Sequence, residues 1–222
     1  MVPNTSAEGV AAEFAALKAI RRFDDLIARS IRLEGDRGYL ACVCELHADD
    51  DETIALLAKW RDEATTFHNQ FQVTFEGTKR WLRERLLDVP HRILFLVLTR
   101  HGHAIGHMGF NHAEPHGGML EVDNVIRGVQ GVEPGLMALG IKALLGWADE
   151  AIRPKGYWLR TYDDNVRAIR FYERLGFAIE ETRPLRRVVE DGVASYVPRP
   201  EGDTAPPDLS HVVMARAPGM GR

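Results

Sequence analysis

Cysteine, net charge and long apolar runs are all scarce in this chain of 222 residues. The two cysteines, Cys42 and Cys44, alternate on a predicted strand and share one face, a poor geometry for a disulfide. We expect both to be small buried residues in a reducing compartment. Because 28 basic residues nearly balance 32 acidic ones, no overall field favours binding to nucleic acid or a membrane surface. Without a secretion signal or an apolar run of membrane-spanning length, the sequence predicts a cytoplasmic protein.

An apolar content of 45% is enough to bury one large core. At the N-terminus, apolar residues recur at three- and four-residue steps, which predicts one amphipathic helix from Val10 to Ile31. The residues of its stripe are Ala16, Ile20, Phe23, Ile27 and Ile31. Residues 33–38 are a glycine-bearing connector, so we expect this helix to pack on the main domain or on a second subunit. The sequence therefore leaves open whether the chain forms a homodimer.

Two shorter helices are expected next. The first carries Ile54, Leu57 and Trp60 toward the core, and the second covers residues 78–87 and is announced by Thr78. Residues 65–75 between them mix polar and aromatic side chains. This linker either forms a wall of a substrate pocket or is an ordinary surface loop.

Three strands then follow without a helix between them. The run from Ile93 to Leu98 is unbroken and apolar, which is typical of a strand covered on both faces. Residues 104–111 and 119–126 return across turns, which predicts the antiparallel part of a mixed sheet. The histidines around these turns suggest a metal site, but they straddle two turns without a cysteine. They are His101, His103, His107, His112 and His116. We expect ordinary surface histidines, and His107 or His112 lining the substrate pocket is the alternative.

The stretch from Asp163 to Phe177, DDNVRAIRFYERLGF, has the signals of a short capped helix. Its residues Asn165, Ala168, Ile169 and Tyr172 share one helical face, and Gly176 ends the helix. A strand at residues 157–162 precedes it. Beyond it, the proline- and arginine-bearing residues 183–207 predict an irregular loop before a last strand at residues 211–215.

A glycine-bearing loop at residues 128–135 leads into a predicted helix that runs to Glu150, with Pro134 at its first position. Exposed backbone N–H groups and the helix dipole favour a pyrophosphate at such a helix start. The segment from Gly131 to Met137 would bind it. Alone, a glycine before a helix is more often just a turn.

The order of elements from Met119 to Phe177, with its N-x-x-A-x-x-x-Y-x-x-x-G-F stretch, resembles that of the GNAT N-acetyltransferases. The resemblance implies an α/β (α+β) fold whose mixed, largely antiparallel sheet is flanked by helices and splayed between its fourth and fifth strands. We expect a helical extension over residues 1–37 and the acetyltransferase domain over residues 38–217. The resemblance also implies acetyl-coenzyme A as co-substrate and no metal.

The same resemblance assigns the coenzyme to three segments. They contribute Asn124, Val125 and Ile126 from the fourth strand, Gly131, Val132, Gly135, Leu136 and Met137 from the loop, and Asn165, Ala168 and Tyr172 from the helix. The loop departs from the family's Gln/Arg-x-x-Gly-x-Gly/Ala pattern. Val132 stands where a basic or amide residue is usual, and Met137 where a small one is usual.

For catalysis, the resemblance makes Tyr172 the acid that protonates the departing thiolate. Glu121 and Asp123 lie two apart on the fourth strand and point to one face, where a carboxylate could take the amine's proton through water. Either could instead orient the amine. Glu121 is slightly preferred as the base.

The sequence EVDNVIRG followed by PGLM is similar to segments of the acetyltransferases of amino-sugar nucleotide pathways. The implied reaction is direct transfer of an acetyl or short acyl group to a primary amine of an amino-sugar nucleotide. Arg61, Arg127 or Arg186 would meet its phosphates. Two alternatives stay open: an acetyltransferase acting on a protein or peptide N-terminus, and a non-catalytic coenzyme A binding or scaffold protein.

Overall fold

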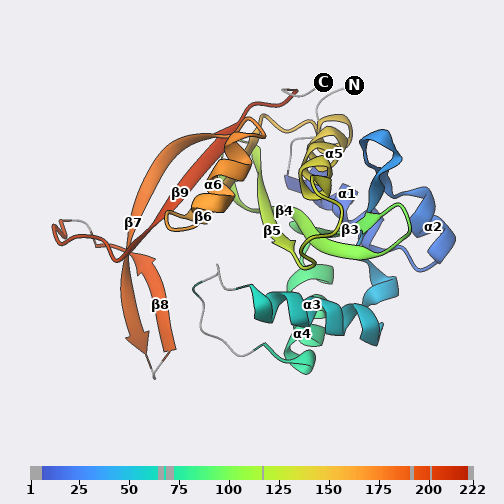
Figure 1. The fold of residues 1–222 in the computed structure, drawn as a ribbon, viewed down its shortest axis with the longest axis horizontal. Coiled ribbons are helices and arrows are strands. Elements are labelled where there is room, and N and C mark those ends of the chain that lie inside the picture. Colours follow the sequence, from blue (N-terminus) through green and yellow to red (C-terminus); the bar gives the residue numbers. More distant parts are fainter. Residues whose placement is uncertain are drawn as a thin grey trace.

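The computed structural model describes residues 7–64, 68, 73–116, 118–190, 193–200 and 202–219. Within them lies a sheet of nine strands in the order β1-β2-β3-β4-β5-β6-β9-β7-β8 (Figure 1). The strands are β1 (Ile31–Arg32), β2 (Gly38–Cys42), β3 (Arg92–Thr99), β4 (Ala104–His116), β5 (Met119–Arg127), β6 (Tyr157–Tyr162), β7 (Ala178–Glu190), β8 (Val193–Pro198) and β9 (Leu209–Arg216). Neighbours are antiparallel except β5 and β6, so the predicted mixed, largely antiparallel sheet is confirmed.

The sheet splits where β5 meets β6. These parallel strands pair at two positions, Leu120 with Tyr157 and Glu121 with Trp158, and then separate. On the other side of β5, Asp123 pairs with Gly109 and Ile126 pairs with His107 of β4. Three residue steps of β5 therefore lie opposite two of β4, so β5 carries one extra residue. The backbone of Asn124, at φ 52°, takes up this bulge. The predicted fourth and fifth strands, at residues 119–126 and 157–162, are β5 and β6, so the predicted splay between them is present.

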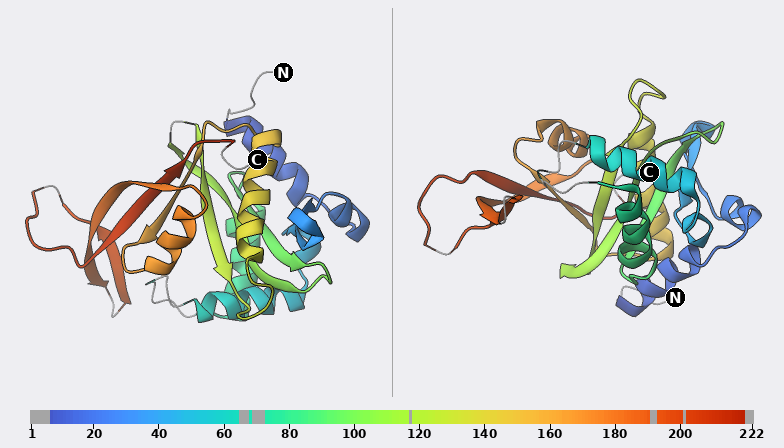
Figure 2. Two further views of the ribbon diagram at one scale, coloured as in Figure 1. Left: turned by 45° about the horizontal axis from the view of Figure 1, so that its top comes forward. Right: turned by 90° about the horizontal axis from the view of Figure 1, so that it is seen from below.

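Helices cover the two faces of the sheet (Figure 2). On one face α1 (Ala7–Lys18) and α5 (Leu136–Ala151) enclose the larger core. On the other face α3 (Asp51–Glu63) and the π-helical segment η3 (Leu82–Leu87) enclose a second core. Alternate residues of β3 enter the two cores, which confirms a strand covered on both faces. Beyond α1 and α2, the helices are α3 (Asp51–Glu63), α4 (Phe75–Trp81), η3 (Leu82–Leu87), α5 (Leu136–Ala151) and α6 (Val166–Glu173), with 3₁₀ turns η1 (Glu34–Asp36) and η2 (Glu45–His47).

The N-terminal segment does not form the predicted single helix from Val10 to Ile31. It forms α1 (Ala7–Lys18), α2 (Phe23–Ala28) and the strand β1, which pairs with β2. Arg22, extended at φ −123° and ψ 139°, separates the two helices. The segment therefore packs on the main core of its own chain.

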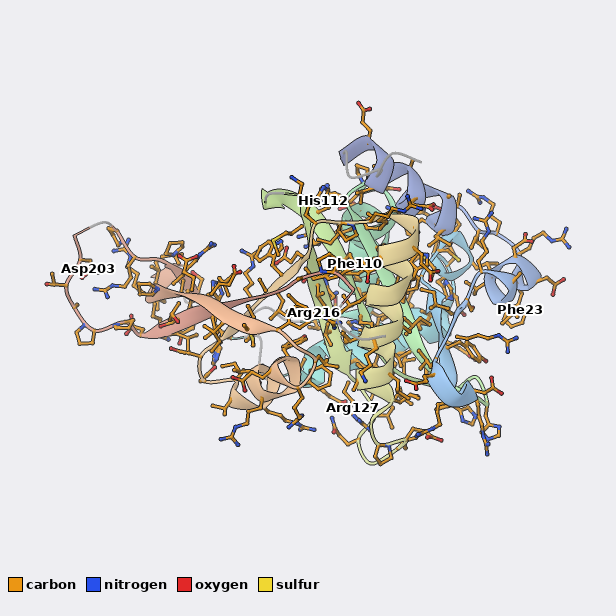
Figure 3. The ribbon with its side chains drawn as sticks, turned by 90° about the horizontal axis from the view of Figure 1, so that it is seen from above. Phe23, Phe110, His112, Arg127, Asp203 and Arg216 are labelled. Atoms are coloured by element: carbon orange, nitrogen blue, oxygen red, sulfur yellow. The ribbon has the colours of Figure 1, made fainter. Side chains whose placement is uncertain are left out.

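The buried stripe of this segment also differs from the predicted one. Phe23 and Ile27 are 68% and 47% exposed, and Figure 3 shows Phe23 at the outer edge of the molecule. Lys18 helps to fix the rotation of α1, because its buried Nζ donates to Leu86 O (3.2 Å) and Val89 O (2.6 Å). The α1 residues that face the core are instead Val10, Phe14 and Leu17.

Residues 183–207 are not the irregular loop that their prolines predicted. Most of them belong to β7 and β8, which pair from Leu185 with Pro198 to Glu190 with Val193. β8 is the last strand of the sheet, where a proline does not interrupt the pairing of two neighbours. This hairpin and β9 form an arm that extends from the body, with Asp203 at its far end (Figures 1 and 3).

Three local predictions need correction. α4 begins at Phe75 and is capped by Thr74, whose Oγ1 accepts from Gly77 N at 3.0 Å, rather than by Thr78. α5 begins at Leu136 with Gly135 as its N-cap, so Pro134 is not the first helical residue. β2 ends at Cys42, so Cys44 lies beyond the strand, although both thiols are free and buried as expected. None of the helices in the described residues is long and apolar enough to cross a bilayer.

Candidate active site

Two neighbouring cavities open where the sheet splits. The first, of about 230 Å³, lies over the ends of β5 and β6 and is called here the β6 cavity. The second, of about 290 Å³, lies between the loop after β5 and helix α6 and is called the loop cavity. Both are lined by Val125, Asn165, Ala168 and Tyr172. These four residues therefore form a wall that the two cavities share.

The loop cavity is basic. Arg127, Arg167 and Arg174 line it, and no acidic side chain does so among the described residues. Figure 3 shows Arg127 at the end of the sheet where the loop leaves β5. Its guanidinium donates to Val129 O (3.0 Å) and to Val132 O, which braces the loop.

The loop presents backbone rather than side chains at the start of α5. Gly131 and Gly135 have φ values of 75° and 85°, and no atom lies within 4 Å of the position that a Cβ would take in either. No side chain caps α5, and Leu136 N donates to the loop carbonyl Glu133 O at 3.1 Å. Glu133, also left-handed at φ 45°, is held by Arg37 at 2.7 Å. These features fit an anionic phosphate group.

Some of the predicted coenzyme residues line one of the two cavities, and the others do not. Val125, Met137, Asn165, Ala168 and Tyr172 line the loop cavity, and Asn124 lines the β6 cavity. The others line neither of the two: Ile126 and Leu136 are buried in the cores, and Gly131, Val132 and Gly135 belong to the loop.

Tyr172 is buried on the wall between the cavities and packs edge-on against Phe171 and Phe177. Burial, and next the negative charge of Asp123, raises the pKa of its phenol well above the ordinary value. The hydroxyl therefore keeps its proton at neutral pH. Asn165, which caps α6, accepts from Ala168 N through Oδ1 at 3.2 Å and so fixes the start of the helix that carries Tyr172.

Glu121 and Asp123 both line the β6 cavity, as their spacing predicted. Glu121 is buried and engaged: Arg160 Nε lies 3.2 Å from its Oε1, and Asn111 Nδ2 donates to its Oε2 at 3.0 Å. The side chain of Asp123 is more exposed, at 28%, and Arg92 Nη2 lies 3.6 Å from its Oδ2. The second carboxylate is thus the more accessible of the two.

Several residues of the β6 cavity were not expected from the sequence. Arg92, Asn111, Arg160, Tyr162 and His211 line it. Arg160 and Tyr162 follow the alternation of β6, but the pairing of β6 with β9 was needed to place His211 beside Tyr162. Only the alternation was visible in the sequence.

Of the arginines expected to meet phosphates, only Arg127 lies at these cavities. The guanidinium of Arg61 stacks on Trp81, 4.4 Å from the ring centroid. Arg186 is exposed on β7. In the linker predicted as a pocket wall, residues 65–67 and 69–72 lie outside the described residues, and His68 is described.

His107 is not a surface histidine. It is fully buried beside Trp60, and its Nδ1 donates to Asn124 O at 2.6 Å, at the bulge of β5. Burial lowers the pKa of its imidazole to about 4, so the ring is neutral at pH 7. Among the described residues, no group of three or more His, Cys, Asp or Glu side chains could hold a metal ion.

A sheet split between parallel strands, a phosphate-type loop and a protonated phenol between two cavities together define the architecture of an N-acetyltransferase. Residues 43–178 match the model of the acetyltransferase (GNAT) domain. The chain therefore belongs to the GNAT acetyltransferases, enzymes that use acetyl-coenzyme A. No curated protein matches the chain in sequence.

Solved structures show the same fold at low sequence identity. A probable GNAT-family acetyltransferase from Chromobacterium violaceum has a TM-score of 0.61 at 16% identity, over 85% of each chain. A ribosomal-protein-alanine N-acetyltransferase from Brucella melitensis has a TM-score of 0.54 at 16% identity, over 75% of this chain and 95% of its own. A spermidine N-acetyltransferase from Vibrio cholerae, in complex with coenzyme A and spermine, has a TM-score of 0.56 at 12% identity, over 75% and 90%. These acceptors differ, so the fold does not define the acceptor of this chain.

Proposed function

We propose that this enzyme transfers an acetyl or short acyl group from acyl-coenzyme A directly to a primary amine, with both substrates bound together. The observation that carries this proposal is the position of Tyr172, which lines both cavities. The basic loop cavity suits the pyrophosphate arm of the coenzyme, and the β6 cavity suits the amine. Thioester and amine would then meet beside the phenol.

In the proposed reaction, the amine nitrogen attacks the thioester carbonyl carbon and the carbon–sulfur bond breaks. Tyr172 gives its hydroxyl proton to the departing thiolate, and the proton lost by the amine passes through water to a carboxylate. Asp123 suits that role because it is the more exposed carboxylate and its charge acts on Tyr172. Glu121, held by Arg160 and Asn111, orients the cavity instead. The products are an amide and coenzyme A; the carboxylate then releases its proton to solvent, and solvent returns one proton to Tyr172.

For the acceptor, we propose the amino group of an amino-sugar nucleotide. Two guanidinium groups, Arg92 and Arg160, line the β6 cavity together with two carboxylates. Such a mixed lining suits an acceptor that has a cationic amine and an anionic phosphate in one molecule. A simple polyamine has no anionic group that could share these arginines with the carboxylates already paired to them.

The test is thiol release from acetyl-coenzyme A with a panel of amino-sugar nucleotides, peptides with free N-termini and polyamines. Turnover of amino-sugar nucleotides is expected. Turnover of peptides alone would instead make the chain an N-terminal acetyltransferase. Tight coenzyme binding without turnover of any amine would identify a coenzyme A binding or scaffold protein.

A further inference from the structure

Four aromatic rings from four separate segments meet beside the β6 cavity. They are His68 from the segment between α3 and α4, Tyr162 from β6, Tyr196 from β8 and His211 from β9, and they are called here the ring cluster. The centroid of Tyr162 lies 4.8 Å from those of both His68 and His211. Tyr196 lies 5.5 Å from His68 and 6.3 Å from Tyr162.

The cluster is part of the cavity wall rather than of a core. Tyr162 and His211 line the β6 cavity directly, and all four side chains are partly exposed. Neither apolar core on the two faces of the sheet includes a ring of this cluster. Tilted and edge-on rings with accessible faces can receive another flat ring.

The charges around the cluster are of both signs and are paired with one another. His68 Nε2 lies 2.7 Å from Asp164 Oδ2. Arg160 Nε lies 3.2 Å from Glu121 Oε1, and Arg183 Nε donates to Glu181 Oε2 at 2.9 Å. A neutral flat ring suits such a lining, because stacking on aromatic rings needs no unpaired charge.

Resting on the proposed function, we infer that the ring cluster is the acceptor's second binding site, where the nucleobase of an amino-sugar nucleotide stacks. Arg160 precedes Tyr162 by two residues on β6, so both side chains stand on one face of the strand. Both also line the β6 cavity. An acceptor lying along β6 would place its amine near Tyr172, its phosphate near Arg160 and its base at Tyr162 and Tyr196.

The test compares Tyr196→Leu with the wild-type enzyme, using an amino-sugar nucleotide and the matching amino-sugar phosphate without a base. Loss of one stacking ring should raise KM for the nucleotide-linked acceptor by about tenfold. The values of kcat and of KM for acetyl-coenzyme A should not change. KM for the amino-sugar phosphate should not change either. Tyr196→Phe, which keeps the ring, should behave as wild type.

Tyr39→Leu is the matched control, because Tyr39 is a partly exposed tyrosine on β2 that lines neither cavity. A second readout needs no turnover: titration of the coenzyme A complex with the free nucleoside diphosphate, which should bind the wild type and bind Tyr196→Leu more weakly. Equal KM increases for acceptors with and without a base would overturn the inference. So would wild-type diphosphate binding by a folded Tyr196→Leu variant. Failure of the proposed function is distinct, since the wild type would then turn over no amine, or peptides alone, and would give no KM for the nucleotide-linked acceptor.

Discussion

The loop cavity and the β6 cavity share four lining residues but are built in different ways. The loop cavity takes its walls from two short stretches of chain, residues 125–137 and 165–174, and offers backbone groups and arginines. The β6 cavity takes its walls from five strands and α6, and pairs each carboxylate with an arginine. One cavity therefore suits a ligand that a whole family shares, and the other suits a ligand particular to this chain.

The largest expected effect comes from the residue that joins the two cavities. Tyr172→Phe removes the proposed acid and keeps the ring contacts, so kcat should fall by about 10³-fold with little change in either KM. Steady-state kinetics across pH, with thermal unfolding as the control for folding, measure this. A variant that keeps full rate at every pH would show that the phenol is not the acid.

A smaller effect should separate the two carboxylates of the β6 cavity. Asp123→Asn should lower kcat by about a hundredfold, because it removes the proposed proton acceptor. Glu121→Gln should mainly lower stability, since it leaves the buried side of Arg160 without its carboxylate. Rates and urea unfolding of both variants decide the assignment, and the reverse pattern would return the base to Glu121.

Acid should destabilise the fold through His107, which is buried on β4 against the bulge of β5. Its folded pKa of about 4 lies below the ordinary value of 6.5, so the unfolded chain binds the extra proton between these values. Stability should therefore fall as pH falls, by about 2 kcal/mol for this group between pH 7 and 5. Urea unfolding at both pH values should show this term lost in His107→Asn and kept in His101→Asn, a change at an exposed turn. An equal acid loss in both variants would contradict the assignment.

The smallest effect should be confined to the loop cavity. Arg167→Ala or Arg174→Ala should raise KM for acetyl-coenzyme A by about fivefold and less at high salt, because an exposed charge contact is lost. KM for the acceptor should not change. Arg170→Ala, on the same helix but outside the cavity, is the control. A rise in the acceptor KM as well would mean that the cavities are not separate binding regions.

The contrast between a cavity built from short stretches of chain and one built from several strands also explains what the sequence could predict. The capped helix with Asn165 and Tyr172, the loop before α5 and the twice-covered strand β3 depend on neighbours along the chain, and each was found from local spacing. The alternation of Glu121 and Asp123 placed both in one cavity for the same reason. Their separate environments depend on Arg160 and Arg92, which come from other strands.

The predictions that were wrong, and the features that were missed, have physical causes too. Two overlapping apolar stripes run through the first helices, and only the packing of α1 selects the one with Phe14 and Leu17. The prolines after Pro184 concealed a hairpin, because β8 is the last strand of the sheet and tolerates them. The ring cluster depends on β9 lying between β6 and β7, an order that no local pattern records.

The two rungs that join β5 to β6 also have a mechanical consequence. The body and the arm side of the sheet meet there at Leu120 with Tyr157 and at Glu121 with Trp158, while every other pair of neighbours except β1 and β2 has more rungs. A ligand seated in the split would add contacts between the two halves to those that the larger core already makes. Coenzyme binding should then stabilise the junction between the two halves. It should slow hydrogen exchange in β6 and β9 as well as in the loop, and make the two halves unfold as one cooperative unit.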